Sequence, residues 1–532
     1  MKTRIIKTIT SLLLVGLVIT GCQKGDLLSN PNVASESSTI PASLLLNQLT
    51  ANFLKEEEPI ISNVYKWNQN IVSNYTYYYG SNAYTWTNTT HKYDQIKYCV
   101  KMEEQALKAY GNNTNVYHAL SKFFRAYSFI WLTNRVGDIP MDEAGNPNIL
   151  TPKYNTQKEV FKKSLMLLDT ANMLMGNLTT AANRNTKVDA NGDIFGLTYL
   201  QWQKVINTYK LRVLISLSKR ADDNADLNIK GQFGAILADA TKYPIMTGIT
   251  DNLVYKFNAA YNQYPPIRVG NTAYNNCANI SKTFYSVTAD YNDPRVFVLT
   301  TPAAAQIAAG KTVSDFTAYV GEDNNKSQAA MSGFSTDGKY SNLSFNRYIS
   351  SAAGANCEPY TVIGYQEMCF NIAEAANRGW ITGQSAATWY LRGINASLEV
   401  YGITNGKVVT VGNNDGTKTN LGSVTLDVTT FLAHPEVAYK GDNADGLKQI
   451  LTQKYVAFFL NSGFETFYNW RRTGVPTFAE GGVGVGTPNL KIPTRWKYPQ
   501  DEITYNAANY KASIDAQYGG VDDQFSKMWL IK

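Results

Sequence analysis

The chain has 532 residues, with 49 lysines and arginines against 42 acidic residues and a formal net charge of +7. No basic run and no alternation of basic with aromatic residues accompanies this small excess, which excludes a nucleic-acid-binding protein. The three histidines, His91, His118 and His434, lie far apart, and no nucleophile elbow, Walker motif or dinucleotide fingerprint is present. The sequence therefore gives little support to an enzyme.

The N-terminus has the pattern of a lipoprotein signal. Basic residues precede a short apolar core over residues 9–19, which ends in Ile-Thr-Gly directly before Cys22. A basic region, an apolar core and small residues before a cut site define a secretory signal, and the cysteine makes it a lipobox. We expect residues 1–21 to be removed and Cys22 to be lipidated; an ordinary cleaved signal with a chance cysteine is the alternative. Two or three acyl chains, at ~0.8 kcal/mol per buried methylene, form a stable anchor.

The rest of the chain is expected to be a tethered body. Residues 22–40 are rich in Ser, Asn, Gly and Pro, which is typical of a flexible tether. Loss of the three basic residues of the signal lowers the net charge from +7 to +4. No stretch after the signal is long and apolar enough to cross a membrane, for which ~20 apolar residues are needed. Since no internal linker is visible, residues 41–532 are predicted to form one body.

Helical stripes mark the first part of this body, residues 41–240. Apolar residues recur at helical spacing from Val116 to Trp131, with Thr114 or Asn115 available as a cap. A capping box, Thr156-Gln-Lys-Glu159, opens a second helix that Gly176 closes, and the two are expected to form a helical hairpin. A third long helix is predicted over Tyr199–Arg220.

The second part of the body changes character twice. Residues 241–360 are rich in Asn, Tyr, Pro, Gly and Ser, which indicates a loop-rich insertion with short strands that carries the ligand face. A second helical part is expected over 361–475, and the last sixty residues are expected to be mostly coil. The elements predicted within 361–475 are helices over 361–378, 385–401, 447–460 and 465–472, with a hairpin within 404–430. Recurring helical pairs predict a mostly α fold with a TPR-like scaffold, although no clean 34-residue consensus is present.

Several short motifs resemble one family, in its own order and across nearly the whole mature chain. They are Lys122-Phe-Phe-Arg-Ala-Tyr127 with Gly137-Asp-Ile-Pro140, Asp193 with Trp202, Asn207 and Leu211-Arg212, Tyr291-Asn-Asp-Pro-Arg295, Glu374-Ala-Ala-Asn-Arg-Gly-Trp380, Gln453-Lys-Tyr455, Trp470-Arg-Arg-Thr-Gly-Val-Pro476 and Tyr498-Pro-Gln-Asp-Glu502. Each motif is weak alone, but the ordered set behind a lipobox resembles the SusD/RagB family, and within it the SusD-like subfamily. The charged residues of these motifs are expected to lock helices together rather than to bind ligand.

The resemblance implies a nutrient-binding outer-membrane lipoprotein that forms a lid over a SusC-like TonB-dependent barrel transporter and passes it glycans or, less often, peptides. It implies no cofactor and no catalysis. Cell-surface exposure follows from the family rather than from the signal, because Asp26 is the one acidic residue close behind Cys22. Two alternatives stay open: a lipid-anchored glycoside hydrolase, and a structural or assembly lipoprotein without a small ligand.

The ligand site is predicted where aromatic residues gather among Asn, Ser and Thr. Sugars present apolar faces and a polar rim, so flat Tyr and Trp rings beside amide side chains suit them. The main candidates lie in one segment, and they are Trp67, Tyr78, Tyr79 and Trp86. A weaker second group, Tyr261 and Tyr264, stands before a Pro-Pro pair. Some of these rings are expected to be core residues instead.

Two other patterns have plainer interpretations. Asp189, Asn191 and Asp193 have the spacing of a calcium loop, but Ile194 and Leu200 replace the glycine and the bidentate glutamate that such a loop needs, so turn chemistry is the better explanation. No metal is therefore predicted. Four further cysteines, Cys99, Cys277, Cys357 and Cys369, are scattered; a disulfide is conceivable, but buried thiols are the main expectation.

Overall fold

A computed structural model describes residues 39–56, 62–257, 276–348, 358–413 and 420–532. Cys22, Tyr261, Tyr264 and Cys357, together with the signal and most of the tether, lie outside the described residues. Residues Ala42–Lys532 form one compact unit. No helix among the described residues combines the length and apolar character needed to span a membrane.

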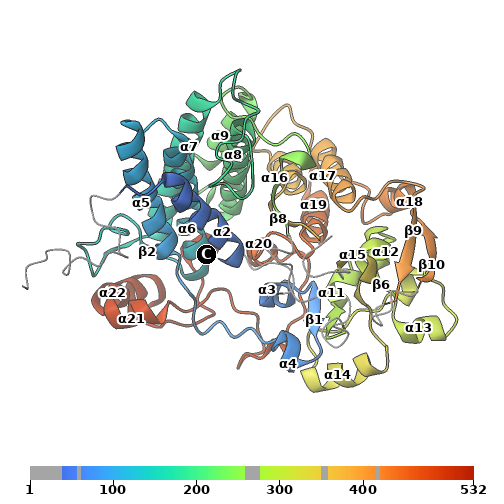
Figure 1. Ribbon diagram of the computed structural model, residues 1–532. Coiled ribbons are helices and arrows are strands. Elements are labelled where there is room, and N and C mark those ends of the chain that lie inside the picture. Colours follow the sequence, from blue (N-terminus) through green and yellow to red (C-terminus); the bar gives the residue numbers. More distant parts are fainter. Residues whose placement is uncertain (1–38, 57–61, 258–275, 349–357, 414–419) are drawn as a thin grey trace, which may run out of the picture. The chain divides into compact units, whose positions relative to one another are not determined.

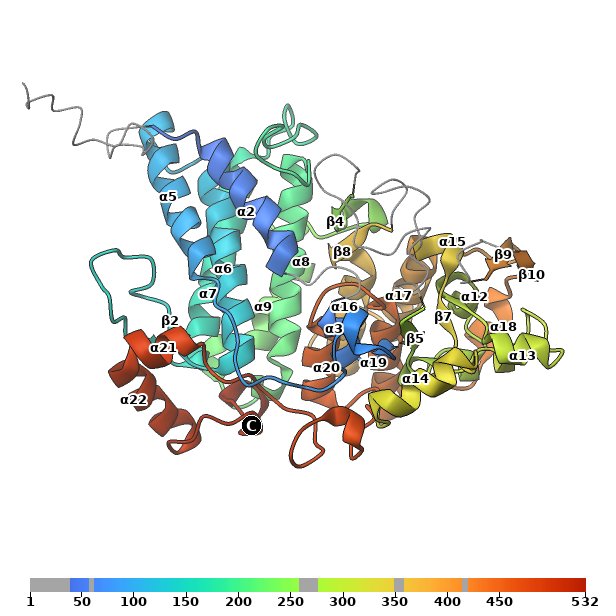
Figure 2. The ribbon, with the colours of Figure 1, turned by 60° about the horizontal axis from the view of Figure 1, so that its bottom comes forward.

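The first part of this unit is a row of helices, each in contact with the next along the chain. Figure 1 and Figure 2 both show them as neighbours. They are α2 (Ala42–Glu56), α5 (Tyr93–Tyr110), α6 (Val116–Val136), α7 (Gln157–Leu178), α8 (Tyr199–Ser216) and α9 (Ile229–Ala238). Helix α6 is buried along almost its whole length and packs against α2, α5 and α7. The predicted α6–α7 hairpin is confirmed.

Side-chain caps fix where these helices begin. Asn115 Oδ1 accepts the backbone N–H of His118 at 3.0 Å, and α6 ends at Gly137, whose φ of +101° suits glycine. The predicted capping box of Thr156 and Glu159 is present at the start of α7. Thr198 and Gln201 form a second box at the start of α8, which the sequence analysis did not identify.

A second group of helices packs onto the first through α8 and α16. It comprises α16 (Tyr365–Asn377), α17 (Ala386–Val400), α18 (Val428–Ala433), α19 (Ala444–Ala457) and α20 (Glu465–Thr473). The predicted helix over 361–378 is wrong at its start, because Tyr360–Ile363 is strand β8, paired with β4 (Leu253–Tyr255). The predicted hairpin within 404–430 is confirmed as β9 (Val408–Gly412) and β10 (Asn420–Thr425). The fold is thus mostly α, with stacked helical pairs.

The described residues of 241–360 form short elements, as predicted, and further short elements lie among the helices of the first part. A four-stranded antiparallel sheet has the order β1-β5-β7-β6, and β2 pairs with β3 elsewhere. The strands are β1 (Ile71–Ser73), β2 (Ile139–Pro140), β3 (Tyr154–Asn155), β5 (Ala278–Ile280), β6 (Thr300–Thr301) and β7 (Asn342–Leu343). The short α-helices are α3 (Asn63–Trp67), α4 (Thr76–Tyr79), α11 (Lys282–Tyr285), α12 (Arg295–Leu299), α13 (Ala304–Ala308), α14 (Gln328–Thr336) and α15 (Phe345–Tyr348). Single 3-10 turns are η3 (Ser218–Arg220), η4 (Ala225–Leu227), η5 (Ile249–Asp251), η6 (Ala289–Tyr291) and η7 (Phe316–Ala318).

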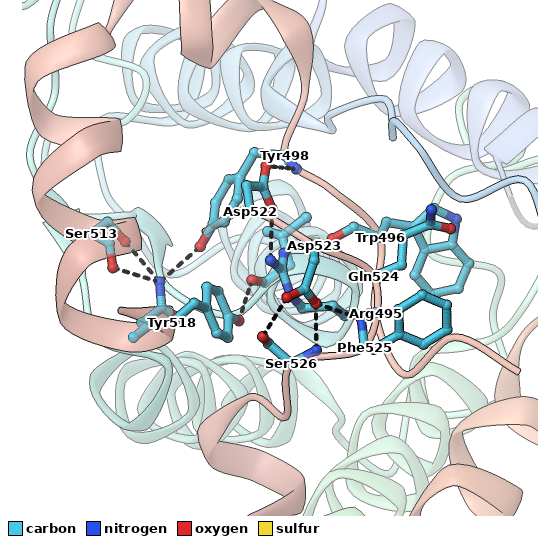
Figure 3. A network of polar contacts seen from close by, with 12 residues as sticks. Arg495, Trp496, Tyr498, Ser513, Tyr518, Asp522, Asp523, Gln524, Phe525 and Ser526 are labelled. Carbon is cyan, nitrogen blue, oxygen red and sulfur yellow. Dashed lines mark hydrogen bonds and ion pairs between the residues drawn. The ribbon is translucent and has the colours of Figure 1, made fainter. Parts of the chain in front are cut away.

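The C-terminal segment is more ordered than expected. Helices α21 (Gln500–Tyr505) and α22 (Ala507–Tyr518) stand where mostly coil was predicted, with turns at η8 (Val483–Val485) and η9 (Trp529–Ile531). The buried Arg495 donates to Asp522 Oδ1 at 2.7 Å and lies 3.9 Å over the ring of Tyr518 (Figure 3). Asp522 also accepts the backbone N–H of Tyr498 at 3.1 Å. This network holds the tail against the first helical group, where Tyr498 donates to Asp138 O at 2.6 Å.

The charged residues of the sequence motifs join elements, as expected. Arg212 of α8 donates to Glu367 of α16 and to Val362 O at 2.7 Å. Arg295 is fully buried and forms an ion pair with Asp293 at 2.6 Å. Arg471 donates to the carbonyl oxygens of Asn134 and Thr494, Arg125 lies 3.6 Å from Glu103, and Arg472 pairs with Glu374.

Candidate functional site

Three tyrosines stand on or beside the short helix α4, and we call them the tyrosine cluster: Tyr75, Tyr77 and Tyr78. Tyr77 is 83% exposed, Tyr75 is also exposed and Tyr78 is half-buried. The ring of Tyr78 lies 5.0 Å from that of Tyr77 and 5.6 Å from that of Tyr75, centroid to centroid. Aromatic rings at this spacing form a largely apolar surface, and the exposure of Tyr75 and Tyr77 leaves this surface open to solvent. Such a surface can receive the apolar face of a sugar ring.

Hydrogen bonds from Lys66 and Asn82 hold the turn that carries the tyrosine cluster. Lys66 of α3 is buried and its ammonium donates to the carbonyl oxygen of Tyr79, the last residue of α4. Burial lowers the pKa of Lys66 to about 8. Asn82 accepts the backbone N–H of Ser73 at 2.8 Å and donates to its carbonyl at 2.7 Å, which closes the loop between β1 and the end of α4. The tyrosines are therefore presented by an ordered turn.

Helix α14 braces the cluster from the side, next to α4 in Figure 1. Gln328 accepts the hydroxyl hydrogen bond of Thr76 at 2.6 Å and donates to Gly80 O at 3.0 Å. Asn74 donates to Ser335 Oγ at 2.7 Å. The same helix presents the ring of Phe334, which has ammonium groups of two lysines within 5 Å of its centroid. The carboxamides and hydroxyls that polar sugar rims need thus lie beside the aromatic surface.

The four main candidates from the sequence divide between surface and core. Tyr78 belongs to the tyrosine cluster. Trp86 is fully buried, with its ring stacked on that of Trp496 at 3.8 Å, so its prediction as a ligand contact is wrong. Tyr79 is also buried and is not part of the exposed surface. Trp67 is half-buried and donates from Nε1 to Ala83 O at 3.0 Å, so its ring belongs mainly to the aromatic core.

The tail of the chain explains why Trp86 is buried. Its backbone N–H donates to Gln524 Oε1 at 3.0 Å, and its carbonyl accepts from Lys497 N at 3.1 Å. Figure 3 shows Gln524 and Trp496 at this junction. Conversely, Tyr75, Tyr77 and Gln328 were not predicted as ligand contacts. The run Tyr75-Thr-Tyr-Tyr-Tyr79 was the available signal for the two tyrosines, and none pointed to Gln328.

The segment with calcium-loop spacing has a structural role. Asp193 is buried, accepts the indole N–H of Trp202 at 2.8 Å and accepts the backbone N–H of Leu197 at 3.1 Å. Burial raises the pKa of Asp193 to about 6. Asp189 accepts two backbone N–H groups of its own turn and the hydroxyl of Tyr117. Within the described ranges no group of three or more His, Cys, Asp or Glu side chains could hold a metal ion.

The buried cysteines offer no reactive thiolate. Cys99 and Cys369 are free thiols in the core, and burial raises the pKa of each to about 12. Cys277 is buried as well. The expectation of buried thiols is thereby confirmed for the described cysteines.

The described residues thus form a stacked-helix scaffold that presents exposed tyrosines on an ordered turn. Residues 31–499 match the SusD-like family that is described as starch-binding and associating with the outer membrane. The chain belongs to this family. No curated protein matches it.

Solved structures agree with this assignment. A SusD homolog of Bacteroides fragilis is 28% identical over 92% of this chain and all of its own, with a TM-score of 0.77. A second SusD homolog of that species is 27% identical over 92% of this chain and 99% of its own, with a TM-score of 0.72. An outer membrane protein of Bacteroides vulgatus, described with a suggested role in nutrient binding, is 25% identical over 93% of this chain and all of its own, with a TM-score of 0.74. The TPR-like scaffold predicted from the sequence is therefore confirmed.

Proposed function

We propose that this protein is a surface lipoprotein that captures an oligosaccharide or polysaccharide on the tyrosine cluster and delivers it to a TonB-dependent outer-membrane transporter. The observation that carries the binding step is the exposure of Tyr75 and Tyr77 on a turn that Lys66 and Gln328 hold in place. A preformed aromatic surface loses little conformational entropy when a ligand binds. Membership of a starch-binding family makes a glycan the first ligand class to test.

The binding step is tested with a soluble form of the mature chain that starts after Cys22, residues 23–532, and a panel of starch-derived α-glucan oligosaccharides, neutral β-linked oligosaccharides and peptides. Isothermal titration calorimetry measures affinity, and each mixture is checked for breakdown products. We expect saturable glycan binding without turnover, weakened by about 1 kcal/mol, or about five-fold, in Tyr77→Ala. Tyr505→Ala is the matched control, since Tyr505 is a 73% exposed tyrosine on α21. Equal loss in both variants, or turnover of the glycan, contradicts the proposal.

The delivery step is tested in cells that use the glycan identified above. Cys22→Ala removes the proposed site of lipidation. We expect this variant to lose metabolic labelling with palmitate, to leave the membrane fraction and to abolish growth on the glycan. Its affinity for the glycan in solution should not change, because the lipid anchor is not part of the tyrosine cluster. Growth at the wild-type rate without the anchor argues against membrane-bound delivery.

A further inference from the structure

A large cleft lies in the helical scaffold, on elements other than those that carry the tyrosine cluster. Helices α7, α8 and α9 enclose it, with the turn at Thr241–Tyr243 at its edge, and its volume is about 840 Å³. Figure 2 shows the three helices together. Small-molecule and cofactor sites have volumes of ~300–1,000 Å³. The cleft is therefore large enough to bind a ligand, and the proposed glycan function does not use it.

The floor of the cleft is polar and keeps unused hydrogen-bonding capacity. Gln203 of α8 donates to Asn172 Oδ1 at 3.1 Å, and Lys210 of α8 donates to Asp169 Oδ1 at 2.5 Å. No donor among the described residues reaches Gln203 Oε1 or Asp169 Oδ2, and Lys210 uses one of its three N–H groups. Gly176 preserves this floor, because a Cβ there would lie 2.9 Å from Gln203 Nε2. The floor thus offers acceptors and donors side by side.

The rim of the cleft is apolar and open to solvent. Met166 and Met173 lie about two turns apart on α7 and are 61% and 55% exposed. Leu165 and Ile236 continue the apolar lining toward the interior. Methionine adapts its shape to different apolar partners and is common on peptide-binding surfaces. Two exposed methionines over a polar floor therefore favour a ligand with apolar side chains and a polar backbone.

Three lysines and two aspartates line the cleft, so its lining carries a net positive charge. Lys210 pairs with Asp169, and Lys162 lies 3.6 Å from Asp226. Lys242 forms no salt bridge with a described residue; a hydrogen bond with Tyr243 and the nearby charges of Asp239 and Asp169 raise its pKa, and its ammonium lies 5.0 Å from the centroid of the Tyr243 ring. An acidic group on a ligand would complement it.

We propose that the cleft between α7, α8 and α9 binds an extended peptide segment of another protein, one with an acidic side chain between apolar side chains. An extended segment leaves its N–H and C=O groups unpaired, and the carboxamides and charged pair of the floor can satisfy them. A helix satisfies its own backbone and would leave the floor unmatched. A glycan fits less well, because Tyr243 is the single aromatic side chain among the described residues that line the cleft.

The test uses the mature chain and a phage-displayed library of random dodecapeptides. We expect selection to converge on peptides with one acidic residue flanked by apolar ones. The synthetic consensus peptide, followed by fluorescence polarisation, should bind Met173→Glu and Lys242→Glu at least about ten-fold more weakly than the wild type. Leu391→Glu and Lys448→Glu are the matched controls, because each changes an exposed residue of the same kind on another helix, and they should bind normally.

Three results would overturn the proposal. The library fails to converge, or the consensus peptide binds the two cleft variants as tightly as the controls, or the cleft variants lose affinity for a glycan. Circular dichroism and thermal unfolding of all four variants separate loss of binding from loss of fold, and a Met173→Leu variant, which keeps the apolar rim, should retain peptide affinity. Glycan affinity at the tyrosine cluster is measured separately with Tyr77→Ala, so failure of the library or of the consensus peptide leaves the capture function untouched, whereas loss of glycan affinity in the cleft variants would place the glycan in the cleft.

Discussion

Replacement of Glu374 by glutamine should remove a large part of the stability of the helical scaffold. Glu374 of α16 accepts from Arg472 of α20 at 2.9 Å and from Arg378 Nε at 2.9 Å, and both Glu374 and Arg472 are buried. Burial by itself would raise the pKa of Glu374, but the guanidinium of Arg472 outweighs it and holds the pKa at about 2. The variant keeps the volume of the side chain and leaves Arg472 without its anion.

Two arguments give similar values for the stability that this ion pair contributes. A carboxyl group whose pKa falls from 4.5 in the unfolded chain to about 2 in the folded one contributes about 3 kcal/mol of stability at neutral pH. Loss of one partner from a buried ion pair costs about 3–5 kcal/mol in other proteins. We therefore expect Glu374→Gln to lower the free energy of unfolding by about 3 kcal/mol.

The pH dependence has a definite sign. Because the folded-state pKa lies below that of the unfolded chain, the contribution of Glu374 is fully present above pH 4.5 and is lost as the pH falls toward 2. Urea denaturation at pH 7 and at steps down to pH 2.5 measures it as the difference between wild type and Glu374→Gln. Glu104→Gln is the control, because Glu104 pairs with Lys101 and Lys108 on the surface and should contribute about 0.5 kcal/mol or less. A cost below about 1 kcal/mol at pH 7, or a difference that does not change with pH, would refute the reasoning.

Three further variants test other parts of the structure. Trp86→Ala should lower the free energy of unfolding, measured by urea denaturation, by about 3–5 kcal/mol, because it leaves a cavity at a fully buried site against Trp496. A variant that stays stable but loses glycan affinity would show that Trp86 belongs to the ligand site. Lys66→Met should lower the free energy of unfolding by about 1–3 kcal/mol, because it removes the buried hydrogen bond to the carbonyl oxygen of Tyr79. Calorimetry should also show weaker glycan binding; unchanged values for both would contradict the role of Lys66 as a support of α4. Thr198→Ala should cost about 1 kcal/mol by removing the cap of α8, measured by thermal unfolding, with no change in glycan affinity.

Much of the helical scaffold could be predicted because its signals are local. The apolar stripe from Val116 and the Thr156 capping box each lie within a few helical turns, and both helices form as expected. The start of α16 was misplaced because Val362 and Ile363 fit the apolar face of a helix as well as a strand, and pairing with β4 decides between the two. Helices α21 and α22 were missed because the contacts that hold this segment are made to residues far away in the sequence, such as Tyr154 to Glu502 and Asn506 to the carbonyl oxygen of Pro152.

The candidate site also combines features that the local sequence predicts with features that distant contacts decide. Aromatic density singled out the segment around Tyr78 as a candidate, but composition is the same for an exposed ring and a buried one. Tyr77 and Tyr79 stand two positions apart on one short helix, and the first is in solvent while the second is buried over Lys66. Trp86 is buried by Trp496, which lies in the last part of the chain. Which aromatic residues meet a ligand is therefore set by long-range packing, and this is why variants of Tyr77 and Trp86 should separate binding from folding.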